Sequence, residues 1–564
     1  MGKDEQIQSN QPGGIPMTSK TEKRGKHKRY QEVEREKKQA KKRGESRQER
    51  KNKKYNPARY LSRNQKEVVQ RLLDGDVTMI SNASWAFIEP FLLFLHEVGF
   101  FEMIGVDGKK FRRQMIEVSL LIMTYSAKVL LGIPSINQVP GRLFRDRTLM
   151  LLIGYSTDQL LSGFCQRGYE DKDKPMHKNV LADAVEKLTA EEVAYILNGA
   201  VKRLAERGVF KQSQGHFALD SSDLEATEHY RGVGKKKVKV RKRLPNKQYI
   251  EYEEYIYGFK VVVIYEVHLR LIVAAQVAPI NKHDSNFTLD LLKQALANVG
   301  QGVIEVLVMD RGFLDGETLW AIKHTYGVDF IVPSKDDMHV TSDARAFRKA
   351  KTDGQYLFRA ERLGEGKKLE GQVRLYGLKG VTAYDQYGDA DHHKKINRKD
   401  FKSNPINAIV VQQWEGKTYR AGDEKVFLTS LPVDQPLAIL DSYDLRSLIE
   451  NCAFRELKQG WHLGKFPKKS DDAVRGHVFL TLIIFTLTNA YRTDVGQDLA
   501  QAGIRRQRLA WQETNKVLVV AGNFYAFFDL EELLIIFNCE PEICWRVDPP
   551  DVRQFYGLSD PVPA

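Results

Sequence analysis

The sequence predicts an α/β protein whose central mixed sheet has flanking helices, follows an all-α N-terminal region and is interrupted by a β-rich insertion. Three observations predict this arrangement. Apolar residues recur at helical spacing through residues 63–208. From residue 217 onward, strand-like runs rich in Val, Ile and Tyr alternate with helical ones. Residues 336–440 lose that alternation and show short apolar runs between Gly- and Lys-rich turns.

A chain of 564 residues is too long for one hydrophobic core, so several domains are expected. Changes in composition predict a basic arm at 1–62 and a helical domain at 63–208, which would serve either as a scaffold or in DNA binding. The catalytic core is expected in two parts, residues 209–335 and 441–495. The β-rich insertion at 336–440 separates them, and residues 496–564 are expected to be a helical C-terminal region.

Positive charge is concentrated at the N-terminus. The formal net charge is +14, and residues 1–63 hold 20 Lys or Arg against 8 Asp or Glu, a net of +12. These residues have few large apolar side chains, so we expect residues 1–56 to be disordered and residues 30–54 to become helical on a phosphate backbone. A basic arm favours a polyanionic partner, most commonly nucleic acid. The alternative is a solvated tail that aids solubility.

The cysteines and the apolar runs argue against a zinc-binding, a secreted or a membrane protein. The four cysteines are scattered and make no zinc-ligand pattern, although Cys539 and Cys544 lie close in sequence. The first residues lack a secretory apolar region, so we expect an intracellular, cytoplasmic protein. The longest apolar stretch, residues 478–490, is shorter than the ~20 residues needed to span a bilayer, and we expect a buried helix and no membrane partner.

An apolar run at residues 303–309 ends on a carboxylate. Leu307, Val308 and Met309 resemble a strand buried on both faces, and Asp310 follows directly, before a turn that Gly312 permits. A carboxylate at such a place requires a nearby cation, which could be Arg311 or a metal ion. The alternative is an ordinary turn aspartate before the next helix.

A second apolar run, residues 217–219, also delivers a carboxylate, Asp220. After a basic loop at residues 235–243, the remaining elements are expected as strands at 255–267 and 269–278, a helix at 285–299, the Asp310 strand, a helix at 316–326 and a strand at 329–333. This order is expected of an RNase H-like mixed sheet. In such a sheet the first and fourth strands are neighbours, so Asp220 and Asp310 would meet at one edge.

A third carboxylate, Glu450, lies on a helix predicted at residues 442–461. Tyr443, Arg446 and Glu450 share one face of that helix, although a solvated salt-bridging face would give the same pattern. Three convergent carboxylates would repel one another unless cations bind between them. Oxygen ligands suit two Mg²⁺ or Mn²⁺ ions, about 4 Å apart, acting on a phosphodiester.

Three motifs give a family resemblance: Leu219-Asp220-Ser221, the Asp310 motif ending Arg311-Gly312-Phe313, and Tyr443-x2-Arg446-x3-Glu450 followed by Lys458. The chain resembles the DDE transposases of bacterial insertion sequences, in particular the family-four group, over residues 217–492. The resemblance implies that Asp220, Asp310 and Glu450 are catalytic and hold two Mg²⁺ (or Mn²⁺) ions. It also implies that the Tyr, Arg and Lys of the third motif contact DNA. The full expected DNA-binding set is Tyr443, Arg446, Lys458, Arg311, Lys235, Lys236 and Lys237.

Some positions depart from the pattern or leave alternatives open. The family has six residues between the Glu and the Lys, and this chain has seven. On a regular helix Leu457 would share the face of Glu450, and Lys458 would lie about 100° away unless the helix is distorted. Asp223 is an alternative first acid, and Asn451 would replace Glu450 in a shifted register. His283 and Asp284 are near-site candidates or a helix cap. Three tryptophans could stack on an extruded base, but core packing is favoured for Trp320, Trp414 and Trp461.

The expected function is that of a transposase acting on double-stranded DNA as a homodimer. It would bind the terminal inverted repeats of an insertion sequence, cleave them and join them to target DNA. Two alternatives stay open: an RNase H-like nuclease without strand transfer, and an inactive derivative that only binds DNA.

Overall fold

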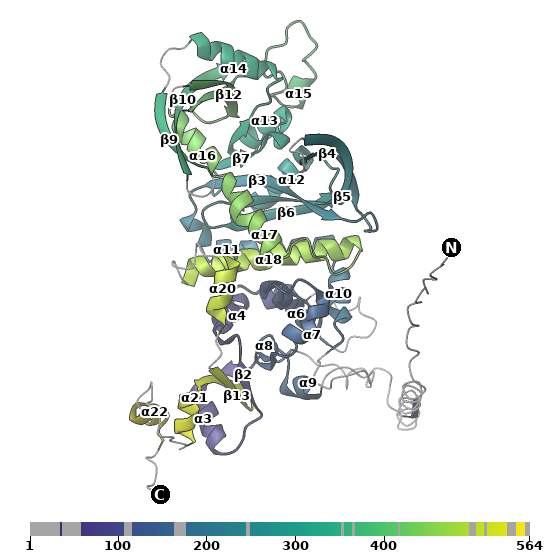
Figure 1. The fold of residues 1–564 in the computed structure, drawn as a ribbon, viewed down its shortest axis with the longest axis vertical. Helices are drawn as coiled ribbons and strands as arrows, with labels where there is room; N and C mark the ends of the chain where they lie inside the picture. The colour runs from purple at the N-terminus through teal and green to yellow at the C-terminus, as the bar shows by residue number, and fades with distance from the viewer. Residues whose placement is uncertain are drawn as a thin grey trace, which may run out of the picture.

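The computed structural model describes residues 34–35, 58–105, 116–162, 176–243, 249–350, 355–363, 367–415, 418–495, 503–512, 516–537 and 549–558. Most of the expected basic arm lies outside these residues, as do Cys165, Cys539 and Cys544. Figure 1 shows an elongated molecule in which the elements of the central sheet lie toward one end, and a small sheet built from the two ends of the chain lies toward the other.

The main sheet contains ten strands within the described residues. Its first part runs β6-β5-β3-β7-β8, in which β3, β7 and β8 are parallel and β5 is antiparallel to both of its neighbours in this part. The bounds are β3 His216–Ala226, β5 Tyr249–Glu266, β6 Leu271–Pro279, β7 Val306–Met309 and β8 Asp329–Pro333. The first and fourth strands expected from the sequence, β3 and β7, are therefore neighbours, as the RNase H-like order requires.

Apolar helices cover one face of this sheet. Helices α11 (Ala190–Glu206), α12 (Thr288–Val299) and α18 (Asp471–Val495) all contact β6, and α11 and α18 lie side by side (Figure 1). Among the described residues, one helix, α18, is long and apolar enough to cross a membrane. However, 94% of its most apolar window is buried within the protein. The expected buried helix at residues 478–490 is thus a core helix of the fold.

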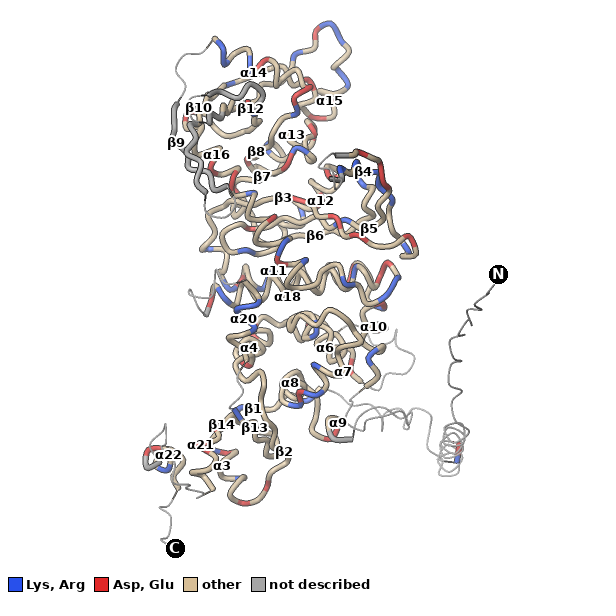
Figure 2. Tube along the Cα trace, in the orientation of Figure 1, with Lys and Arg blue, Asp and Glu red and all other residues tan. Residues whose placement is uncertain are grey.

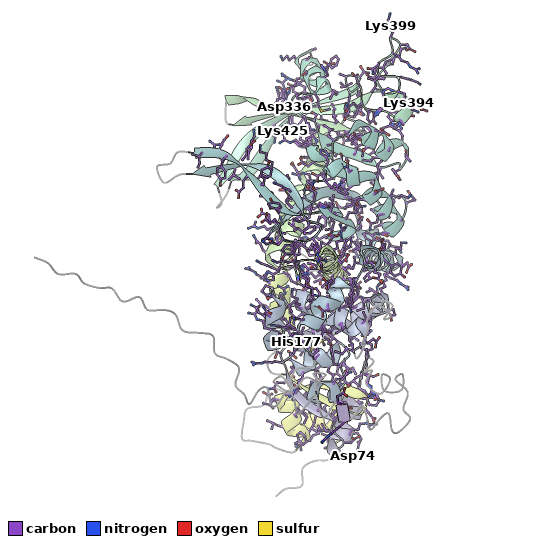
Figure 3. The ribbon with its side chains drawn as sticks, turned by 90° about the vertical axis from the view of Figure 1, so that its right-hand side faces the viewer. Asp74, His177, Asp336, Lys394, Lys399 and Lys425 are labelled. Atoms are coloured by element: carbon purple, nitrogen blue, oxygen red, sulfur yellow. The ribbon has the colours of Figure 1, made fainter. Side chains whose placement is uncertain are left out.

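The expected basic loop at residues 235–243 is instead a strand, β4 (Gly234–Arg243), paired with the first half of β5. The two strands form a ribbon that projects from the body (Figure 3). Lysine has a low strand propensity, which hid β4 in the sequence. The pairing is stabilised across the ribbon, because Lys239 lies opposite Glu253 and Arg241 lies opposite Glu251.

The insertion extends the main sheet rather than forming a separate one. Strand β12 pairs with β8, and the order continues β12-β11-β10-β9, antiparallel throughout. The residues expected to form the β-rich insertion contain four strands: β9 Gln355–Leu363, β10 Lys367–Val381, β11 Ile406–Glu415 and β12 Thr418–Thr429. Helices α14 (His339–Ala350) and α15 (Ala390–His393) were not expected.

Two expectations about the ends of the chain are wrong. The region 63–208 is not all helical, because it contains β2 (Met79–Ala83), and the region 496–564 contains the hairpin β13 (Lys516–Ala521) and β14 (Phe524–Asp529). With β1 (Ser62–Arg63), these strands form a sheet of order β1-β14-β13-β2. Short apolar runs do not distinguish a strand from a helix, and the partner strands are more than 400 residues apart.

The other helices connect these parts. In the N-terminal region they are α3 Gln65–Leu73, η1 Ala86–Ile88, α4 Glu89–Glu97, α5 Phe100–Met103, α6 Val118–Leu130, η3 Ile136–Gln138, α7 Val139–Arg142, α8 Arg147–Leu152, α9 Thr157–Ser162, α10 Asn179–Glu186 and η4 Val209–Gln212. In the core they are η5 Asp284–Phe287, η6 Arg311–Phe313, α13 Gly316–His324, α16 Pro436–Asp444, η7 Ile449–Phe454 and α17 Arg455–Gln459. Near the C-terminus they are α20 Ile504–Trp511, α21 Leu530–Ile536 and α22 Pro549–Tyr556.

Candidate active site

Two of the three expected acids lie side by side where β7 ends, between the interior strands β3 and β7, a place that we call the acidic edge. Leu219 on β3 is the register partner of Met309, the last residue of β7. Each is followed by an aspartate: Asp220 within β3, and Asp310 directly after β7. Parallel neighbours in a sheet are about 4.8 Å apart, so the chain brings two carboxylates together from residues far apart in sequence.

The third acid, Glu450, reaches the same edge from η7, which contacts β3. Arg446 joins the acids: its Nη1 donates to Asp220 Oδ2 at 2.9 Å and to Glu450 Oε1 at 3.1 Å. A single guanidinium nitrogen therefore lies between carboxylates supplied by a strand and by a helix.

Burial raises the pKa of Asp220 to about 6. The Ser221 amide, which donates to Asp220 Oδ1 at 2.8 Å, and the charge of Arg446 oppose this rise. The charges of Glu450 and Asp310 add to it, which requires both of them to be near. The three carboxylates thus share one electrostatic environment.

Tyr443 and Arg446 form the wall of the site. The Arg446 guanidinium lies 5.8 Å from the centre of the Tyr443 ring, and that ring packs on Phe427 of the insertion at 4.6 Å. Burial lowers the pKa of Arg446, but the tyrosine and the three carboxylates together raise it. Arg446 is therefore a permanent cation, held by acids on several sides.

The helix that carries Glu450 is distorted. Residues Ile449–Phe454 form a π-helix, which accommodates one more residue per turn than an α-helix would. Leu457 is fully buried, whereas Glu450 and Lys458 are both exposed. The regular-helix expectation that Leu457 shares the face of Glu450 is thus wrong. The π-turn absorbs the extra residue between Glu450 and Lys458.

The alternative site residues have other partners. Asp223 Oδ2 accepts from Lys236 Nζ at 2.9 Å. His283 caps η5 by accepting from the Ser285 amide, which is the capping role considered for it. Asp284 has a different role: its Oδ1 accepts from the buried Lys260 at 2.6 Å. Lys260 was missed in the sequence, where a lysine between Phe259 and Val261 in a strand was the available signal.

The cations expected to bind DNA differ in whether an acid already pairs with them. Lys235 is exposed over the Tyr255 ring at 4.0 Å, and Arg311 is exposed at η6. Lys236 is paired with Asp223, and Lys237 is paired with Glu253. Figure 2 shows basic and acidic positions together along the β4–β5 ribbon. Glutamates on β5 therefore offset part of the positive charge of β4.

The tryptophans whose side chains the structure describes pack in the core. Trp461 is buried and donates to Glu456. The partly buried Trp320 packs against the His324 ring and makes an edge-to-face contact with Tyr387. The side chain of Trp414 is outside the described residues.

The acids fit a hard divalent cation in chemistry but not in their present arrangement. Within the described residues no cluster of three or more His, Cys, Asp or Glu side chains is arranged as a metal site. Arg446 Nη1 instead lies within hydrogen-bonding distance of both Asp220 and Glu450. Two carboxylate oxygens already share one cationic group there, and oxygen donors of this kind suit Mg²⁺ or Mn²⁺.

Asp220 within β3, Asp310 directly after the parallel strand β7 and Glu450 from a helix together supply oxygen donors of the type that hard divalent cations bind. Residues 211–487, just under half of the chain and including all three acids, match the family described as the transposase DDE domain. This match supports a transposase of the DDE class. No curated protein matches the chain.

Among solved structures, one similar chain is that of a piggyBac transposase, determined by cryo-EM in a synaptic complex with hairpin DNA. It is 10% identical, and the alignment covers 84% of this chain and 86% of that one with a TM-score of 0.35. A likeness this distant carries no argument about this chain.

Proposed function

We propose that this protein is a DDE transposase of a bacterial insertion sequence. It binds the terminal inverted repeats of its element and catalyses metal-dependent cleavage and strand transfer of DNA. The observation that carries the proposal is the meeting of Asp220, Asp310 and Glu450 at the acidic edge, inside the segment that matches the transposase DDE domain.

The three acids are assigned the metal-binding role. Asp220 offers a carboxylate from within β3, Asp310 offers one from the end of β7, and Glu450 offers one from a helix that can adjust at its π-turn. Two Mg²⁺ or Mn²⁺ ions held there would activate the attacking oxygen and stabilise the leaving one. Ionised carboxylates are needed for this, so binding favours a pH above the range in which Asp220 is protonated.

Arg446 is assigned two positions that exclude each other. Without cations it neutralises Asp220 and Glu450, and its bidentate guanidinium also suits a DNA phosphate. Cations bound between the acids would take over the neutralising role and release Arg446 toward the DNA. Tyr443 and Lys458 on the same helical segment, together with Arg311 and Lys235–Lys237, would contact the DNA near the cleaved end.

The test is cleavage of a duplex carrying the inverted repeat found beside the gene, with Mg²⁺ or Mn²⁺. We expect nicked ends and, with target DNA, joined products from a complex containing two protein copies. Asp310→Asn should reduce both products at least about 1,000-fold. Cleavage retained in folded Asp310→Asn would refute the assignment, and nicking without joined products would indicate a nuclease.

A matched control separates charge loss from lost structure. Asp329 is the first residue of the neighbouring parallel strand β8, so it lies at the opposite end of these strands from Asp310, and it pairs with Lys323 at 2.6 Å. Asp329→Asn removes a carboxylate of similar setting away from the site. Its cleavage rate should stay near that of the parent.

A further inference from the structure

A buried ion pair lies behind the turn that follows Asp310. Lys260, in the centre of strand β5, is only 4% exposed. Its Nζ donates to Asp284 Oδ1 at 2.6 Å and to the Lys282 carbonyl at 3.0 Å. A lysine so deep in a sheet is costly unless it is paired, so this contact fixes the loop at 282–284 to β5.

The second oxygen of Asp284 faces the turn. A Cβ placed on Gly312 would lie 3.3 Å from Asp284 Oδ2, so the carboxylate rests directly against that glycine. Gly312 belongs to η6, whose turn closes by a hydrogen bond from the Phe313 amide to the Asp310 carbonyl at 3.0 Å. The segments η5 and η6 are in contact. Asp284 thus touches the turn that Asp310 begins.

The same loop also touches the base of the ribbon. A Cβ on Gly234, the first residue of β4, would lie 2.7 Å from the backbone nitrogen of Ile280. The segment from Ile280 to Asp284 therefore packs between the ribbon and the Asp310 turn. Lys260 on β5 fixes this segment through its hydrogen bonds to the Lys282 carbonyl and Asp284.

We propose that the Lys260–Asp284 pair is a positioning strut that holds the Asp310 turn in place and so sets the Asp310 carboxylate relative to Asp220. This inference rests on the proposed function, because it assigns the strut to that same acidic site. Neither residue reaches the reacting atoms. They act through the backbone of the turn, and small displacements of a reacting group have large kinetic effects.

The test uses the full chain with the double variant Lys260→Met/Asp284→Asn, which removes both charges with little change of volume. Removing both members of a buried pair is often neutral for stability, whereas removing one leaves a buried charge uncompensated. We expect a melting temperature near that of the parent. The cleavage kcat should fall about tenfold or more, with the KM for the duplex within about twofold.

A second measurement does not depend on activity. Titration with Mn²⁺ alone, followed by electron paramagnetic resonance, should show the same number of bound ions and a half-saturation raised about threefold or more. If the folded double variant keeps the parental kcat and Mn²⁺ half-saturation, the pair has only a structural role and the inference is overturned. A parent that cuts no DNA would instead refute the proposed function, while the Mn²⁺ titration would still test the strut.

The control is the pair Arg348–Glu424, which joins α14 to β12 of the insertion at 2.9 Å. Its side chains are 18% and 10% exposed, close to the 5% and 23% of Lys260 and Asp284. Arg348→Met/Glu424→Gln should change neither kcat nor Mn²⁺ binding.

Gly312→Ala tests the same contact with the pair intact, should the double variant fail to fold. The added methyl group would press on Asp284 and displace the turn slightly. It should lower kcat several-fold with an unchanged melting temperature, and a parental kcat would overturn the strut.

Discussion

Two cations in this protein, the partly buried Arg446 and the buried Lys128, have opposite surroundings. Arg446, at the acidic edge, lies among Asp220, Asp310 and Glu450, which raise its pKa against the effect of burial. Lys128, in helix α6, is 1% exposed and lies 5.3 Å from the Tyr125 ring, and no acid among the described residues pairs with it. Burial lowers the pKa of Lys128 to about 8.

The difference shows where the charges of this fold are compensated. At the acidic edge, the cation and the acids neutralise one another. Under the proposed function this pairing breaks, because metal ions take the place of Arg446 between the acids. Around Lys128 the nearby groups, His462 and His477, are themselves bases whose pKa values are lowered by burial. The charge of Lys128 is therefore uncompensated by these neighbours and destabilises the folded state.

Among the variants that test this contrast between Arg446 and Lys128, Arg446→Gln should have the largest effect. The variant loses the proposed phosphate contact, so DNA cleavage should fall about 100-fold. It also loses the cation that competes with metal, so Mn²⁺ should bind several-fold more tightly in the absence of DNA. Mn²⁺ titration and cleavage kinetics on one preparation check these opposite changes. Weaker Mn²⁺ binding would show that Arg446 supports the acids rather than competing for them.

Asp220→Asn should stabilise the metal-free protein. A carboxyl whose folded pKa is raised from 3.8 to about 6 binds more protons in the folded state, so its contribution falls as pH rises between those values. Above pH 6 the ionised group destabilises the fold in full. The amide variant should therefore gain about 1–2 kcal/mol at pH 7.5, with the gain shrinking toward pH 4. Urea unfolding at several pH values measures this, and a uniform loss of stability would show that the Arg446 contact dominates.

The same contrast explains what the sequence could predict. The apolar runs before Asp220 and Asp310 predict each strand and its carboxylate from a few neighbouring residues. The spacing of Tyr443, Arg446 and Glu450 likewise predicts the helix that carries them. The position of the π-turn could not be predicted from the sequence, because it accompanies tertiary packing in which Leu457 is buried and Lys458 is exposed. The terminal sheet depends on pairing between Met79–Ala83 and a hairpin more than 400 residues later. The Lys260–Asp284 contact likewise exists only once the sheet is formed.

Lys128→Met should stabilise the protein, because it removes the buried charge on the other side of this contrast. A lysine whose folded pKa is lowered from 10.5 to about 8 is charged in both states below pH 8, where the full burial penalty applies. The penalty is relieved as pH rises from 8 to 10.5. Methionine should add about 2 kcal/mol at pH 7, and less at pH 9.5. Thermal unfolding at both values checks the trend, and an equal gain at both would mean that packing rather than charge is responsible.

The smallest effect is expected for Lys235, an exposed lysine that forms no ion pair with an acid among the residues the structure describes. Lys235 lies over the Tyr255 ring, whereas its neighbour Lys237 is paired with Glu253. If the ribbon contacts DNA phosphates, Lys235→Ala should weaken duplex binding about two- to fivefold and reduce the salt slope by about 1. Lys237→Ala should have a smaller effect, because its charge is already partly neutralised. Binding measured at several salt concentrations decides between them, and equal losses would mean that Glu253 releases Lys237 when DNA binds.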